Sequence, residues 1–199
     1  MTGGRIAVFL DRDGTLNEEV NFIRTPDELH LIPGAAGAVR KLNDRDVVTC
    51  VISNQSGIAR GFLTEEDLGP IHARLNNELS RDRARIDRIY YCPHHPTEGK
   101  APYNIACSCR KPHPGMLQQG EQEFGIDLAR SFVVGDRIVD VQVGIAVGAT
   151  PILVLTGYGI HAVEECAAQD VHPAFIAPSI VEAVDFIVHK LKGDTPTND

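Results

Sequence analysis

Short apolar runs alternate with amphipathic stretches along the chain. The runs at residues 6–10, 47–52, 86–92, 131–136, 151–155 and, more weakly, 174–176 have the length and composition of strands. Between them, apolar residues spaced three and four apart predict helices at residues 35–45, 64–81, 115–124, 137–148 and 180–191. Because strands alternating with helices are typical of βαβ units, the sequence predicts an α/β fold with a parallel sheet.

The chain has the length and composition of one globular domain, expected over residues 1–199. With 199 residues and 43% hydrophobic content it can bury a sizeable core. Residues 18–33 form a connection long enough to be a functional loop, and residues 193–199 are expected to fray.

Charge and cysteine content exclude several classes of protein. A net charge of −8 argues against a nucleic-acid or anionic-membrane partner, and no apolar run approaches membrane-spanning length. The amino terminus enters the first strand at once, so we expect no signal peptide and a cytoplasmic protein. We expect a monomer, because no heptad pattern or large exposed apolar stripe is present. The 5 cysteines, an odd number, favour metal binding or burial over disulfides.

Two carboxylates follow the first strand. Asp11 and Asp13 are two residues apart where the chain reaches the carboxyl edge of the sheet, so both can face one point. Close carboxylates repel each other unless a cation lies between them, which favours a metal site over a capped turn without a ligand. An EF-hand is excluded because Gly14 is the fourth residue of the loop rather than the sixth, and Phe22 occupies the place of the bidentate Glu.

Other polar residues follow later strands. Ser53 opens a polar cluster after the second strand, where hydroxyls and backbone amides suit a phosphate oxygen, although a helix-capping turn is the alternative. Asp136 ends the fourth strand. Together with Asp11 and Asp13 it predicts a Mg²⁺ site, while Ser53 and Lys111 would meet the other phosphate oxygens.

Cysteine and histidine cluster in the segment 92–109. C-P-H-H-P begins at Cys92, and C-S-C ends at Cys109. Cys92, His94, Cys107 and Cys109 offer a tetrahedral set for structural Zn²⁺, with His95 as an alternative to His94. Three reduced cysteines beside surface histidines are the alternative. Because Lys111 follows so closely, a zinc loop would also fix the position of its ammonium group.

Four motifs in order resemble those of the haloacid dehalogenase superfamily of phosphatases. They are D-R-D-G-T from Asp11, I-S-N-Q from Ile52, the Lys of R-K-P at Lys111, and G-D-R-I-V-D from Gly135. C-P-H-H-P with C-S-C-R-K-P-H-P-G-M-L further resembles the D-glycero-D-manno-heptose 1,7-bisphosphate 7-phosphatases. The resemblance implies a three-layer, Rossmann-like open sheet with a zinc-loop insertion and no large cap domain.

The resemblance also implies residue roles. Asp11 would be the nucleophile and Asp13 the general acid and base, with Ser53 and Lys111 stabilising the transferred phosphoryl group. Mg²⁺ would bind the side chains of Asp11 and Asp136 and the backbone carbonyl of Asp13, and Asp140 would orient these ligands. The residues expected to bind substrate are Glu19, Phe22, Asn54, Gln55, Arg110 and Arg137.

The implied substrate is a phosphorylated sugar. The expected reaction is removal of the C7 phosphate in heptose nucleotide synthesis; the alternatives are a histidinol-phosphate phosphatase and a non-catalytic phosphosugar-binding module. Arg137 stands where many heptose enzymes have Lys, and residues 19–22 differ from the Asp-His-Gly-Tyr type of segment. These departures leave open the exact substrate, including the preferred anomer. The choice between the ADP-heptose and GDP-heptose pathways is open as well.

Overall fold

One parallel sheet forms the centre of the structure, a computed structural model that describes residues 4–193. The strand order is β3-β2-β1-β4-β5-β6, and every neighbouring pair is parallel. The strands are β1 (Ala7–Leu10), β2 (Val48–Asn54), β3 (Arg88–Cys92), β4 (Phe132–Gly135), β5 (Thr150–Val154) and β6 (Phe175–Ala177). The predicted α/β fold with a parallel sheet is confirmed.

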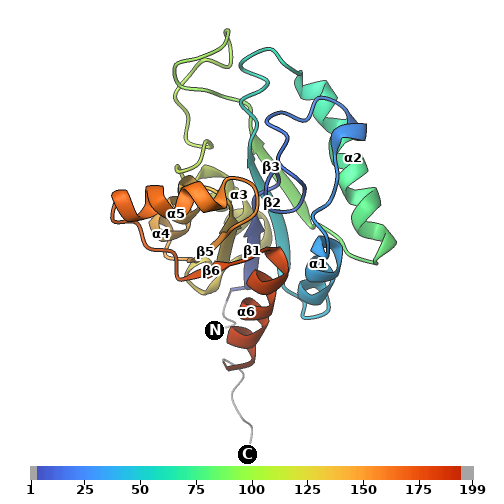
Figure 1. Ribbon diagram of the computed structural model, residues 1–199, viewed down its shortest axis with the longest axis vertical. Coiled ribbons are helices and arrows are strands. Elements are labelled where there is room, and N and C mark those ends of the chain that lie inside the picture. Colours follow the sequence, from blue (N-terminus) through green and yellow to red (C-terminus); the bar gives the residue numbers. More distant parts are fainter. Residues whose placement is uncertain (1–3, 194–199) are drawn as a thin grey trace, which may run out of the picture.

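Helices cover both faces of the sheet, which makes three layers (Figure 1). They are α1 (Ala35–Asn43), α2 (Glu65–Arg81), α3 (Gly115–Phe124), α4 (Ile138–Ala146), α5 (Gly159–Ala168) and α6 (Ile180–Gly193), with short 3-10 turns η1 (Pro26–Glu28) and η2 (Leu128–Arg130). Val8 and Leu10 of β1 pack in the same cluster as α1, α2 and α6, whereas Ala7 and Phe9 pack with α3 on the other face. Because β1 is buried on both faces, it appears in the sequence as an unbroken apolar run.

The helix α5 was not predicted from the sequence. Its buried side chains are small and few, Ala162 and Cys166, and exposed residues surround them, so its apolar stripe is weak. The helices α1 and α4 end two residues earlier than predicted. Gly193, expected to belong to a frayed tail, is the last residue of α6, and the rest of that tail lies outside the described residues.

The strand order determines where ligands are expected to bind along the carboxyl edge of the sheet. The connection that follows β1 leads to β2, and the connection that follows β4 leads to β5 in the opposite direction along the sheet. The β1–β4 boundary is therefore the switch point, where ligands bind in open α/β sheets. Residues 93–114 form a loop that projects beyond this edge (Figure 1).

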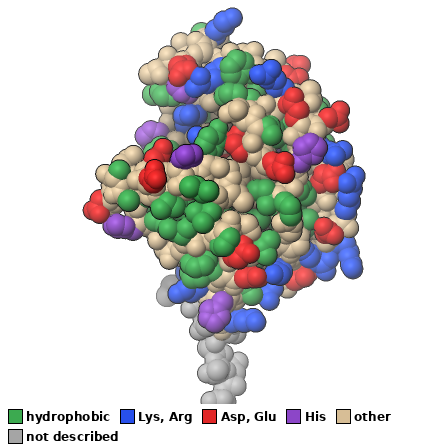
Figure 2. All heavy atoms as spheres, viewed as in Figure 1, with side chains coloured by type: hydrophobic (Ala, Val, Ile, Leu, Met, Phe, Trp, Pro, Cys, Tyr) green, Lys and Arg blue, Asp and Glu red, His purple; other side chains and the backbone are tan. Residues whose placement is uncertain are grey.

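The surface is mixed in character. Acidic and basic side chains are interspersed on the face shown in Figure 2, around apolar patches near α5 and the start of α6. Within residues 4–193, none of the helices is both long and apolar enough to cross a membrane.

Candidate active site

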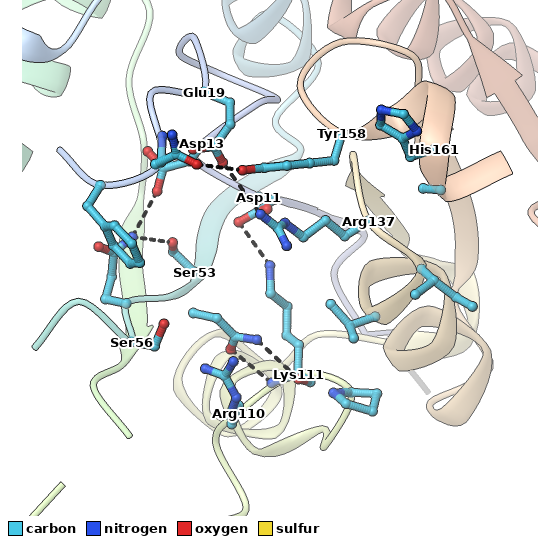
Figure 3. Close-up of a pocket in the computed structure, with 18 of the residues that line it drawn as sticks. Asp11, Asp13, Glu19, Ser53, Ser56, Arg110, Lys111, Arg137, Tyr158 and His161 are labelled. Carbon is cyan, nitrogen blue, oxygen red and sulfur yellow. Dashed lines mark hydrogen bonds and ion pairs between the residues drawn. The ribbon is translucent and has the colours of Figure 1, made fainter. Parts of the chain in front are cut away.

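A cavity of about 580 Å³ opens at the carboxyl edge of the sheet (Figure 3). All of the predicted catalytic and substrate-binding residues line it: Asp11, Asp13, Glu19, Phe22, Ser53, Asn54, Gln55, Arg110, Lys111 and Arg137. The wall also contains residues for which no role was predicted, among them Asn21, Arg60, Tyr158 and His161.

Three acids cluster beside this cavity, and one of them, Asp11, lines it. Oxygen atoms of Asp11, Asp136 and Asp140 lie within 4.8 Å of one another. Asp136 is fully buried, and its Oδ1 has no hydrogen-bond partner within the described residues. The backbone packs tightly against this carboxylate at Gly14 and Gly157, which both have positive φ. A Cβ at either position would lie 2.1 Å from Asp136 Oδ2, so only glycine fits.

Burial and mutual repulsion act against ionisation of these acids. Burial, opposed by Lys111 but assisted by Asp140, raises the pKa of Asp11 to about 7. Burial together with the charge of Asp11 raises the pKa of Asp136 to about 8. A set of oxygen donors that includes an unpartnered buried carboxylate oxygen fits the coordination preferences of Mg²⁺.

Asp13 lies apart from this acid cluster. Its carboxylate accepts hydrogen bonds from Arg12 at 3.0 and 2.8 Å, from Asn17 at 2.9 Å and from Gln55 at 2.9 Å. Burial acts to raise the pKa of Asp13, but the charge and hydrogen bonds of Arg12 outweigh it, so the pKa is lowered. No role was predicted for Arg12, which is fully buried and favours the ionised form of Asp13.

Lys111 is, like Arg12, a buried cation of the site. Its Nζ lies 2.9 Å from Asp11 Oδ1 and 2.6 Å from Asp140 Oδ1, and it donates a hydrogen bond of 2.9 Å to the carbonyl of Ile52. Burial opposes the charge, but the two carboxylates outweigh it and raise the pKa of Lys111. The ammonium group is therefore charged and held beside Asp11.

Asn54 positions Lys111 in this structure. Its amide donates to the Lys111 carbonyl at 3.1 Å and accepts from the Lys111 N–H at 3.0 Å. The side chain was predicted to bind substrate; these two bonds use one of its N–H groups and one lone pair of its oxygen, and the residue lines the cavity. Ser53 keeps a donor available, because its Oγ accepts from Gln55 at 2.7 Å and the hydroxyl hydrogen can point into the cavity.

Three arginines line the outer part of the cavity. Arg60 forms an ion pair with Glu98, whereas Arg137 lies over the ring of Tyr158, 3.8 Å from its centroid, and 3.8 Å from Glu19. Arg110 donates to the carbonyl of His94 at 3.1 Å and has no ion-pair partner among the described residues. The guanidinium of Arg110 therefore retains donors for an anion.

The predicted zinc ligands lie together. Cys92 Sγ is 3.0 Å from Cys109 Sγ and 3.5 Å from Cys107 Sγ, and His94 Nδ1 is 3.4 Å from Cys109 Sγ. Zn–S bonds of about 2.3 Å place sulfur atoms roughly 3.8 Å apart in a tetrahedron, so the cluster fits Zn²⁺ after a small expansion. His95 faces away from the cluster: its Nδ1 accepts from the Glu98 N–H at 3.0 Å. The geometry therefore favours His94 as the fourth ligand.

The chain is similar to proteins of known activity. The profile of the HAD-hydrolase-like family matches residues 108–183. The D-glycero-beta-D-manno-heptose-1,7-bisphosphate 7-phosphatase of Yersinia pestis is 41% identical over 170 residues, 85% of this chain and 90% of its own. The enzyme of the same name from Escherichia coli K12 is 40% identical over 164 residues, 82% of this chain and 86% of its own.

Solved structures show the same likeness. The crystal structure of D,D-heptose 1,7-bisphosphate phosphatase from B. bronchiseptica, complexed with magnesium and phosphate, superposes with a TM-score of 0.82. That protein is 31% identical, and the match covers 93% of this chain and 99% of that one.

Proposed function

This chain belongs to the haloacid dehalogenase-like phosphatases, which hydrolyse phosphoric monoesters, and we propose that it removes the C7 phosphate of D-glycero-D-manno-heptose 1,7-bisphosphate. The names of its relatives supply the substrate. The observation that carries the chemistry is the placement of Asp11 in the cavity, beside the Lys111 ammonium and close to the carboxylate of Asp136, whose Oδ1 has no hydrogen-bond partner among the described residues.

Asp11 is the proposed nucleophile. Its Oδ1 contacts the Lys111 ammonium and accepts from the Arg12 N–H at 2.8 Å, which leaves Oδ2 for attack on phosphorus. The new Oδ2–P bond forms an aspartyl-phosphate as the bond from phosphorus to the C7 oxygen breaks, and water then hydrolyses this ester. When bound by the side chains of Asp11 and Asp136, with the Asp13 carbonyl as the expected further ligand, Mg²⁺ would shield the nucleophile from the negative charge of the phosphate. Lys111 and the Ser53 hydroxyl bind the phosphoryl oxygens.

Asp13 is the proposed proton donor to the leaving oxygen and the base that later takes a proton from water. The Arg12 ion pair favours the ionised form, which suits the second step. The first step needs a protonated carboxyl group, so we infer that Asp13 leaves Arg12 as the substrate enters.

Arg110 and Arg137 are the proposed ligands of the second phosphate, at C1. Arg110 hydrogen-bonds the backbone of His94, so Zn²⁺ bound by Cys92, His94, Cys107 and Cys109 would fix the position of this guanidinium. The zinc loop would then contribute to substrate binding by holding Arg110 in position.

A comparison of turnover tests this function. Phosphate release is measured with Mg²⁺ on heptose 1,7-bisphosphate as both anomers, on histidinol phosphate and on fructose 1,6-bisphosphate, with Asp11→Asn as the inactive control. We expect the highest kcat/KM with the heptose. A preference for histidinol phosphate would select the rival enzyme, and no release from any substrate would favour a binding module. Monomeric state and cytoplasmic location stay predictions.

A further inference from the structure

Tyr158 connects three parts of the cavity wall. Its backbone N–H donates to Asp136 Oδ2 at 2.8 Å, and its hydroxyl donates to Asn21 Oδ1 at 3.0 Å. Its ring lies against the guanidinium of Arg137, with Cζ 3.8 Å from the ring centroid. Figure 3 shows both side chains extending into the cavity that Asp11 also lines.

We propose that Tyr158 is a positioning residue that holds the Arg137 guanidinium in place for the second phosphate of the substrate. The inference rests on the proposed function, because it requires a substrate that carries two phosphates. Tyr158 itself need not touch the phosphate that is cleaved.

Arg137 depends on this ring for its orientation. Its side chain is 49% exposed, and its ion pair with Glu19 spans 3.8 Å, longer than the roughly 2.7–2.9 Å of a charge-assisted hydrogen bond. Across residues 4–193 the guanidinium has no hydrogen-bond partner. A stacked ring restricts the rotamers of a flexible arginine and leaves the N–H donors at its edge for a phosphate.

The ring itself is held at both ends. Its backbone is fixed at Asp136, where Gly157 allows the close approach described above. Its hydroxyl is anchored on Asn21, which adopts φ 69 and donates its N–H to Glu19 Oε1 at 2.6 Å. Tyr158 therefore joins the long connection 18–33 to the start of α5 across the cavity. A substitution of its side chain leaves the backbone bond to Asp136 intact.

The experiment compares two substrates that differ only in the second phosphate. Steady-state kinetics are measured for heptose 1,7-bisphosphate and heptose 7-phosphate with Tyr158→Ala, Tyr158→Leu and Tyr158→Phe. For Ala and Leu, which lack an aromatic face, we expect KM for the bisphosphate to rise about tenfold with kcat within about twofold. KM for the 7-phosphate should change less than about twofold, and Phe should restore most of the loss because it keeps the ring.

Two further measurements separate positioning from a general structural effect. Tyr158→Ala combined with Arg137→Ala should bind the bisphosphate no more weakly than Arg137→Ala alone, because the ring acts through the guanidinium. The matched control is Ile160→Ala, two residues along in α5, where the side chain is 68% exposed and does not line the cavity. It should behave as wild type. Leu is closer to Tyr in size than Ala is, so Tyr158→Leu takes the place of Tyr158→Ala in these comparisons if Tyr158→Ala does not fold.

The inference is overturned if both substrates are affected equally, if kcat falls instead of KM rising, or if the effects of Tyr158→Ala and Arg137→Ala add in full. Failure of the proposed function looks different: wild-type protein then leaves the heptose substrate uncleaved. In that case the same variants are compared on the bisphosphate and monophosphate of a sugar that is cleaved. If no sugar phosphate is cleaved, the inference is tested by calorimetry, which measures the binding of fructose 1,6-bisphosphate and of fructose 6-phosphate to Asp11→Asn.

Discussion

Replacing Lys111 with Met removes the only cation that touches two acids of the buried cluster among the described residues. Its Nζ lies 2.9 Å from Asp11 and 2.6 Å from Asp140, and the lysine is 3% exposed. Met has a similar length but no charge, so the two carboxylates would face each other without compensation. Breaking a buried ion pair costs about 3–5 kcal/mol.

The expected consequence is a large loss of thermal stability in the metal-free protein. For a chain of this size, 1 kcal/mol shifts Tm by about 2–4 °C, so Lys111→Met should lower Tm by roughly 6–20 °C. Differential scanning calorimetry at pH 7 measures this shift. The loss should shrink at pH 5, because carboxyls without a cation have raised pKa values and take up protons there.

A double-mutant cycle separates charge from packing. Asp140→Asn removes one of the two carboxylates, so Lys111→Met combined with Asp140→Asn should melt above Lys111→Met alone. If Lys111→Met melts within about 2 °C of wild type, or if Asp140→Asn restores none of the loss, the electrostatic account of the cluster is wrong.

Three further predictions concern the acids and the zinc loop. Asp11→Asn should abolish phosphate release with Tm unchanged or higher, because it replaces a buried carboxyl whose ionisation is unfavourable; near-normal turnover would refute the nucleophile assignment. Cys107→Ser should lose bound zinc, measured by metal analysis, and reduce activity; an unmutated protein without zinc would contradict the proposed loop. Mg²⁺ should raise Tm more at pH 8 than at pH 6. The pKa of Asp136 is raised to about 8, so proton binding stabilises the metal-free fold, and this contribution is lost as pH rises from about 4 to 8. At pH 6 Mg²⁺ must displace the proton, which weakens its stabilising effect. Equal Tm shifts at both pH values would show that Mg²⁺ displaces no proton.

Much of the site was predictable because its parts obey local rules. A strand buried on both faces appears as an apolar run, and Asp11 and Asp136 directly follow two such runs. Parallel strands bring their carboxyl ends to one edge, so these acids were expected to lie close together. Cys92 and His94, like Cys107 and Cys109, are neighbours in the chain, and their spacing alone indicated a metal-binding loop.

Contacts between distant segments could not be predicted in this way. Asn54 holds the backbone of Lys111 across 57 positions of the chain, and Tyr158 reaches Asn21 across 137. Nothing local to either residue indicates its partner, and the weak stripe of α5 hid the helix that begins beside Tyr158. The sequence alone determined which chemical groups reach the edge of the sheet, since periodicity and strand ends are local properties. Only the tertiary structure decided which side chains line the cavity and which hold their neighbours, because that depends on packing among elements far apart in the chain.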